Sequence, residues 1–231
     1  MSTASMDQIT QARAERTLLR PRFLAAAGIL LFLAGFIALM GIITAEALYP
    51  EGYSTSKNAI SDLGATQPPD SVIEKPSATI FDAAMIVTGL LVLGAAFFLE
   101  RGFRRVAVPI LTALTGVGIL GVGVFPGNYG NVHALFALLI FSAGGLAAIV
   151  SRTIQTPPFS VVSIVLGVIS LGMLVLYMIL GDNSPTAGLG LGGIERWVAY
   201  PILAWTMSFG GYLMGRASHN EMAGPTAYIV D

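Results

Sequence analysis

The sequence predicts an all-α integral membrane protein: a six-transmembrane-helix bundle with both termini cytoplasmic. Of its 231 residues, 55% are hydrophobic and 11% are charged, whereas a soluble domain has about 25% charged residues. The mean hydropathy is +0.76, and six apolar runs each approach the roughly 20 residues that cross a bilayer. The uneven distribution of arginine and lysine between the connecting segments supplies the orientation.

We divide the chain into a cytoplasmic basic arm (1–22), a membrane domain (23–215) and a cytoplasmic tail (216–231). The apolar runs of the membrane domain lie at about 23–45, 78–99, 107–125, 132–150, 158–180 and 197–215. The first run is longer than the roughly 7–15 apolar residues of a signal peptide. We therefore expect an uncleaved first helix.

Positive residues concentrate on the cytoplasmic side of multi-pass proteins. With the N-terminus inside, the inner segments hold nine of the twelve cations: Arg13, Arg16, Arg20, Arg22, Arg101, Arg104, Arg105, Arg152 and Arg216. The outer segments hold only Lys57, Lys75 and Arg196, together with eight of the thirteen acids. The sequence thus predicts a multi-pass protein of the cell membrane.

Composition also excludes several classes of function. The net charge of −1 provides no field for nucleic acid, and a chain without cysteine has no disulfide, thiolate nucleophile or zinc–sulfur site. Of the two histidines, His219 falls on the cytoplasmic side, which leaves His133 short of the three protein ligands of a catalytic zinc. We expect no metal and no cofactor.

A glycine pattern inside the third run needs a structural interpretation. Gly116, Gly118 and Gly121 match the dinucleotide fingerprint GxGxxG, but that motif functions only between a strand and the N-terminus of a helix. Here it lies within an apolar helix. We therefore expect these glycines to serve helix packing.

The first outer loop, at about 46–77, is much longer than the usual connection of about 4–6 residues. Its hydrophobic residues predict that it folds over the mouth of the bundle: Ile60, Leu63, Val72 and Ile73. We expect Gly64 to adopt a positive φ in a turn after Asp62.

Polar side chains from several segments share the depth of the outer membrane boundary. They are Asn58, Ser61, Asp62, Asp82, His133, Glu195 and Arg196. Ionisable groups at membrane depth are costly and usually functional, and we expect these side chains to converge on one outward-facing polar vestibule.

Each candidate also has a purely structural interpretation. Asn58 and Ser61 can satisfy turn backbone, and Asp82 can interact with the positive end of a helix dipole. Glu195 and Asp62 can form ion pairs with nearby cations, and His133 can be an interfacial histidine whose hydrogen bonds are satisfied.

Three functions remain open. In the first, the vestibule binds a lipid head group or small polar ligand: Arg196 meets an anionic group, and Glu195 completes a site with His133, Asp62 and Asn58. In the second, a lipid-modifying hydrolase or transferase uses His133 as general base with Asp82 or Asp62. Ser61 is its candidate nucleophile, although no GxSxG signature surrounds it.

In the third, the protein is a structural subunit of a membrane complex. Membrane lipids are the expected partners in every case, and the oligomeric state stays open.

Four short motifs carry a resemblance to a known family: Asn58-Ala59-Ile60-Ser61-Asp62-Leu63-Gly64, Ile80-Phe81-Asp82, Val124-Phe125-Pro126 followed by His133, and Gly192-Gly193-Ile194-Glu195-Arg196. Together they resemble the prokaryotic membrane family called domain of unknown function 998, along essentially the whole chain without its tails. The family name implies no activity. The layout is also loosely similar to the Frag1/DRAM/Sfk1 group of six-helix proteins tied to lipid handling, from which we transfer no residue role.

Overall fold

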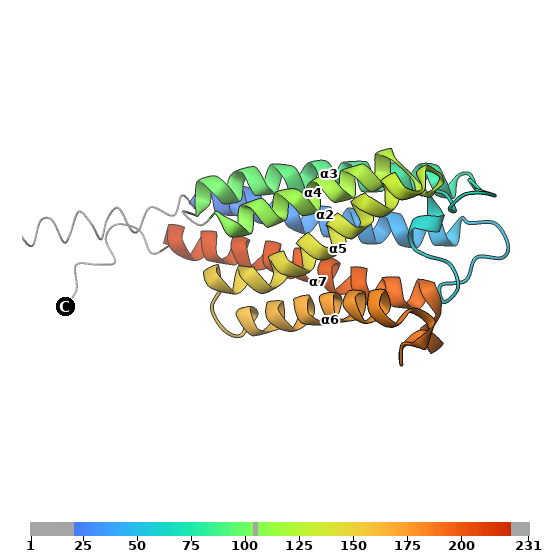
Figure 1. The fold of residues 1–231 in the computed structure, drawn as a ribbon. Coiled ribbons are helices and arrows are strands. Elements are labelled where there is room, and N and C mark those ends of the chain that lie inside the picture. The colour runs from blue at the N-terminus through green and yellow to red at the C-terminus, as the bar shows by residue number, and fades with distance from the viewer. Residues whose placement is uncertain (1–20, 104–105, 223–231) are drawn as a thin grey trace, which may run out of the picture.

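The computed structural model describes residues 21–103 and 106–222, and these residues form helices and connecting turns without any strand (Figure 1). Six long helices make up the bundle: α2 (Pro21–Ala47), α3 (Ser77–Gly102), α4 (Ala107–Val124), α5 (Asn131–Ser151), α6 (Phe159–Leu180) and α7 (Gly190–Met222). Short 3-10 turns lie between them: η1 (Ser61–Leu63), η2 (Gly127–Tyr129), η3 (Arg152–Ile154), η4 (Gly181–Asn183) and η5 (Ala187–Leu189).

Five of these helices, α2 to α6, are long and apolar enough to cross a membrane, which indicates a membrane-embedded protein. The helix α7 does not belong to this set. It begins at Gly190, seven residues before the predicted run, and includes Glu195 and Arg196. Its two tryptophans, two tyrosines, two serines and one threonine also lower its hydropathy, although at 33 residues it is the longest helix described. A sixth span and the cytoplasmic location of both termini stay predictions.

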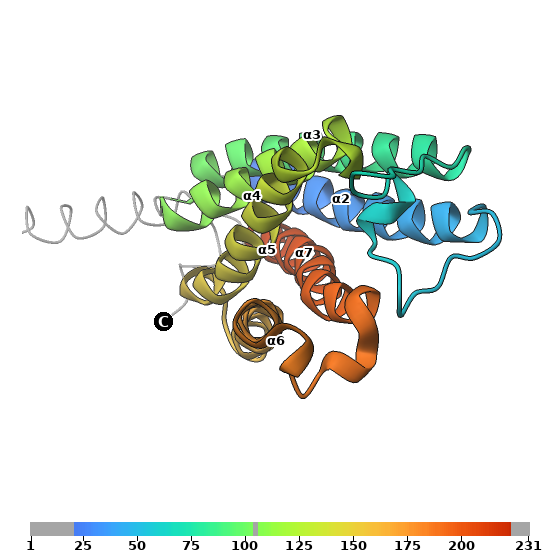
Figure 2. The ribbon, with the colours of Figure 1, turned by 45° about the vertical axis from the view of Figure 1, so that its right-hand side comes forward.

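The helices close into a ring because α2 packs against both α3 and α7. Small residues permit close contact between α2 and α7: a Cβ added to Gly28 would lie 2.6 Å from the carbonyl oxygen of Gly210. Helix α6 contacts α5 and α7 at the edge of the bundle, as Figure 2 shows. The interior is therefore formed mainly by α2, α3, α4, α5 and α7.

We call one end of the bundle the loop end: it carries the segments 48–76, 125–130 and 181–189 (Figure 1). The segment 48–76 is ordered there and packs down on the helices, as the sequence predicts. Ile60 is 5% exposed and Leu63 is fully buried. Val72 and Ile73 are 44% and 52% exposed, so the expectation that they anchor the loop is wrong. The short turn at 61–63 provides the anchor instead.

Gly64 follows this turn with φ −85° and ψ −53°, so the predicted positive φ is wrong. Glycine is required at this position because a side chain would collide with residues of α3. A Cβ at Gly64 would lie 2.5 Å from Asp82 Oδ1 and 3.1 Å from a ring carbon of Phe81. The missing side chain allows the loop to sit directly on the first turns of α3.

Candidate functional site

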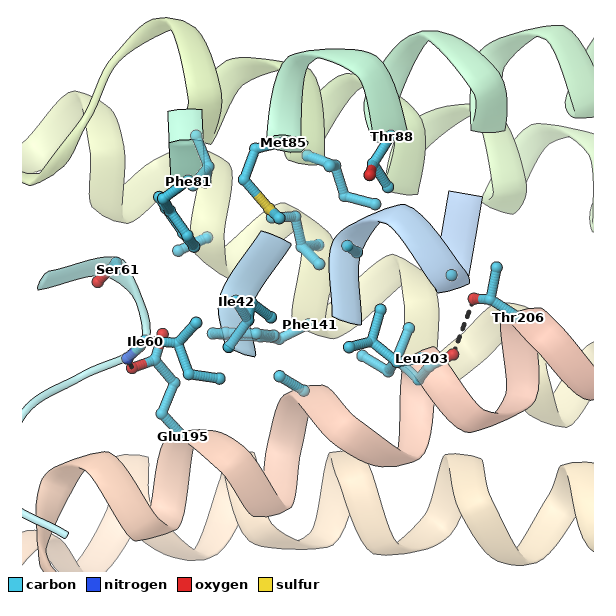
Figure 3. A pocket seen from close by; sticks show the side chains of 18 of the residues that line it. Ile42, Ile60, Ser61, Phe81, Met85, Thr88, Phe141, Glu195, Leu203 and Thr206 are labelled. Atoms are coloured by element: carbon cyan, nitrogen blue, oxygen red, sulfur yellow. Dashed lines mark hydrogen bonds between the residues drawn. The ribbon is translucent and has the colours of Figure 1, made fainter. Parts of the chain in front are cut away.

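A cavity of about 80 Å³ lies inside the half of the bundle nearest the loop end. Its walls come from α2, α3, α4, α5 and α7, and the turn at Ile60 and Ser61 covers it (Figure 3). Most lining residues are apolar, among them Ile42, Phe81, Met85, Phe141 and Leu203. An interior of this kind favours an apolar occupant.

Five polar side chains line the cavity: Ser61, Thr88, His133, Glu195 and Thr206. The two threonines lie deep in the bundle, where Thr88 Oγ1 donates to the Ala34 carbonyl (3.4 Å) and Thr206 Oγ1 to the Ile202 carbonyl (2.8 Å). Ser61, His133 and Glu195 belong to the loop end. The cavity is therefore amphipathic along its length.

His133 is the third residue of α5 and is only 2% exposed. Its Nδ1 lies 2.8 Å from the carbonyl oxygen of Phe125, at the C-terminal end of α4. Carbonyl oxygens at a helix end lack a helical donor, and a carbonyl can only accept. Nδ1 therefore carries the proton, and in the neutral ring Nε2 is an acceptor. This Nε2 is buried without a hydrogen-bond partner.

Glu195 holds the roof of the cavity to α7. The backbone N–H of Ile60 donates to Glu195 Oε2 at 2.7 Å. Glu195 precedes the apolar run 197–215. The pKa of its carboxyl is raised to about 7, chiefly by burial and to a smaller extent by the charge of Asp62, and against the lowering effects of the Ile60 hydrogen bond and the charge of Arg196.

Arg196 is occupied by acceptors of the protein itself. Its Nη1 donates to the carbonyl oxygens of Thr55 (2.8 Å), Asn58 (3.1 Å) and Gly192 (3.0 Å). Its Nη2 donates to a carboxylate oxygen of Glu46 and to the Tyr53 hydroxyl (2.7 Å). The arginine thus joins the end of α2, the loop and α7, and it lies outside the cavity lining.

Two further groups complete this network. The Tyr53 hydroxyl donates to the Ala59 carbonyl (3.1 Å), and burial raises its pKa to about 12 although the hydrogen bond from Arg196 lowers it. Asp62 Oδ2 accepts from the Ala59 N–H (3.0 Å) and the Asn58 amide (3.4 Å). Asn58 Oδ1 accepts from the N–H of Ser54 (3.0 Å). Asn58 and Asp62 thus shape the loop.

Asp82 lies beside the loop and outside the cavity lining. Its Oδ1 is buried without a hydrogen-bond partner and faces the backbone at Gly64. The hydrolase hypothesis needs a base that is hydrogen-bonded to a nucleophile and an orienting carboxylate. Since His133 uses Nδ1 for Phe125 and leaves Nε2 unpaired, the structure contains neither of those hydrogen bonds.

The structure therefore divides the seven predicted site residues into three groups. Ser61, His133 and Glu195 share the cavity. The hydrogen-bond network of the loop contains Asn58, Asp62 and Arg196. Asp82 is separate from both. Across residues 21–103 and 106–222, no group of three or more histidine, aspartate or glutamate side chains is placed to hold a metal ion.

Sequence reasoning missed Glu46 and Tyr53, the side-chain partners of Arg196. The available signal was an excess of acids in the outer segments with a single arginine among them. It also missed the cavity itself. Its lining includes small residues on three helices: Gly35, Ala38, Ala137 and Ala199.

Comparison with known proteins identifies a family for this chain. Residues 32–211 match the model of the family described as "Protein of unknown function (DUF998)". This match covers most of the chain and all six helices in whole or part, so the chain belongs to that family. No curated protein and no solved structure matches it.

Proposed function

We propose that this protein binds a small amphipathic ligand, such as a membrane lipid component, in the cavity below the loop end. The observation that carries this proposal is the unpaired Nε2 of His133, buried at the polar end of an otherwise apolar cavity. A buried acceptor without a partner costs about 1–3 kcal/mol. A ligand that donates a hydrogen bond there would remove this cost.

The same geometry changes the role expected for Arg196. Its two terminal nitrogens contact five protein oxygens, one of them on Glu46. An anionic head group would have to compete with this carboxylate. We therefore assign ligand contact to His133, Ser61 and Glu195, and assign Arg196, Asn58 and Asp62 to the support of the roof.

We propose further that α7 is a sixth membrane span and that the loop end faces the outside of the cell. Nine of the twelve cations would then be cytoplasmic. The polar end of the cavity would open toward the outer leaflet or the external medium. A ligand would reach it past Ile60 and Ser61.

The test is to purify the protein in mild detergent and identify bound small molecules by mass spectrometry. Ala199→Phe places a ring in the cavity, while Ala83→Phe makes the same change on the exposed surface of α3. We expect an amphiphile to accompany the wild type and Ala83→Phe and to be lost from Ala199→Phe. Equal amounts in all three folded proteins would contradict the proposal.

A further inference from the structure

Two of the three polar side chains at the mouth of the cavity, His133 and Glu195, present hydrogen-bond acceptors. His133 Nδ1 donates to the Phe125 carbonyl, so Nε2 of the neutral ring presents only a lone pair. The Glu195 carboxyl adds a second acceptor group, with Oε2 bonded to the Ile60 N–H. Ser61 contributes a hydroxyl, which both donates and accepts.

The deeper part of the cavity provides no free donor. The hydroxyl protons of Thr88 and Thr206 are directed to the carbonyl oxygens of Ala34 and Ile202. All other lining residues have glycine, aliphatic, methionine or phenylalanine side chains. The two threonine oxygens can still accept, but the rest of this surface is hydrocarbon, so this part of the cavity suits a hydrocarbon group.

The cavity lining also includes no arginine or lysine. Arg196, the sequence neighbour of Glu195, pairs with Glu46 outside the lining. A carboxylate or phosphate would lose its hydration without meeting a counter-charge, and it would lie beside the Glu195 carboxyl. Burial of an unpaired charge is strongly unfavourable, so these head groups are disfavoured.

We infer that the ligand class is a neutral amphiphile with one hydroxyl group at its polar end, an alcohol with a hydrocarbon chain. Its O–H would donate to His133 Nε2, and its oxygen could accept from Ser61. The volume of about 80 Å³ is about five to eight times the roughly 10–15 Å³ needed for one water. It therefore suits part of one hydrocarbon chain and excludes a two-chain lipid as a whole.

This inference rests on the proposed function, and one experiment separates the two. The full-length protein in phosphatidylcholine nanodiscs is labelled with a long-chain alcohol that carries a photoreactive diazirine on its chain. Labelled peptides are identified by mass spectrometry. The competitors are dodecanol, dodecyl methyl ether and dodecanoic acid, which share a chain but differ in charge and in the ability to donate.

We expect label on peptides of the cavity wall, and we expect dodecanol to compete about tenfold better than the ether, as the loss of one buried hydrogen bond implies. The acid should compete less well than dodecanol. His133→Ala should remove the preference for the alcohol over the ether, while His219→Ala, at an exposed position near the other end of α7, should retain it.

Equal or stronger competition by the ether or the acid in the wild type would overturn the assignment of an alcohol and leave the site intact. Absence of label from the cavity peptides, or label that no competitor reduces, would overturn the proposed function as well. The competition by alcohol, ether and acid in the wild-type protein tests the alcohol assignment even if His133→Ala fails to fold.

Discussion

The backbone N–H of Ile60 lies 2.7 Å from Glu195 Oε2, and this hydrogen bond connects the roof of the cavity to α7 across 135 positions of sequence. The carboxyl is buried, with its pKa raised to about 7. The strength of this connection is therefore coupled to pH within the physiological range.

The first prediction follows from that pKa. A carboxyl whose pKa is about 4.5 when unfolded and about 7 when folded contributes stability that is fully present below pH 4.5. This contribution is lost as the pH rises through about 7, because the unfolded chain releases the proton more readily. Thermal unfolding in detergent between about pH 4 and pH 9, a range that spans this titration, should show the unfolding temperature decline.

Glu195→Gln is the matched variant, because its amide oxygen can still accept from Ile60 while the charge is absent. Its unfolding temperature should decline less over the same interval. An identical pH profile for the variant and the wild type would contradict the assignment to Glu195.

The second prediction concerns the pair of Arg196 and Glu46, whose side chains are 11% and 21% exposed. Removing one member of a fully buried ion pair costs about 3–5 kcal/mol, and the partial exposure of this pair makes that range an upper bound here. Arg196→Met should therefore lower the free energy of unfolding strongly. Arg152→Met, at an exposed position, is the control, and equal effects in denaturant titrations would refute the structural role.

A third prediction concerns Gly116, where a Cβ would lie 3.0 Å from Leu93 Cγ and 3.1 Å from the Leu93 nitrogen. Gly116→Leu should reduce the yield and thermal stability of the folded protein, because α3 and α4 can no longer approach as closely. Gly172→Leu provides the comparison, since a Cβ at Gly172 meets nothing within 4 Å. Equal stability of both variants would show that this packing is unimportant.

The fourth prediction is the topology. The chain has no cysteine, so a single introduced thiol reports one position. Ser56→Cys and Ser218→Cys are both at exposed sites, at the loop end and near the end of α7. An impermeant thiol reagent added to intact cells should label the first and not the second. Labelling of Ser218→Cys alone would reverse the predicted orientation.

Helix positions could be predicted because the apolar runs have the length of a membrane span and are separated by polar segments. The start of α7 could not be predicted in this way. Glu195 and Arg196 marked the opening of the last helix, just before the run 197–215, whereas the structure accommodates both inside a helix that begins at Gly190 and gives them partners on the loop. Those partners lie 135 and 141 positions away in the sequence, so no local pattern indicates them.

The depth of the site residues was also predictable, since charge is restricted to the ends of apolar runs. The division of these residues into a cavity and a supporting network was not predictable. That division depends on the direction of the His133 ring and on which carboxylate reaches Arg196. The cavity arises from side-chain volumes on five helices, and no local pattern encodes it.

The packing of α2 against α7 has a consequence for biogenesis. These are the first and last helices described, and Gly28 approaches Gly210 closely where they meet. During synthesis α2 enters the membrane while α7 is still to be translated, so its small-residue surface must first be covered by lipid or by another protein. The ring, and with it the cavity, is completed only when α7 displaces that cover.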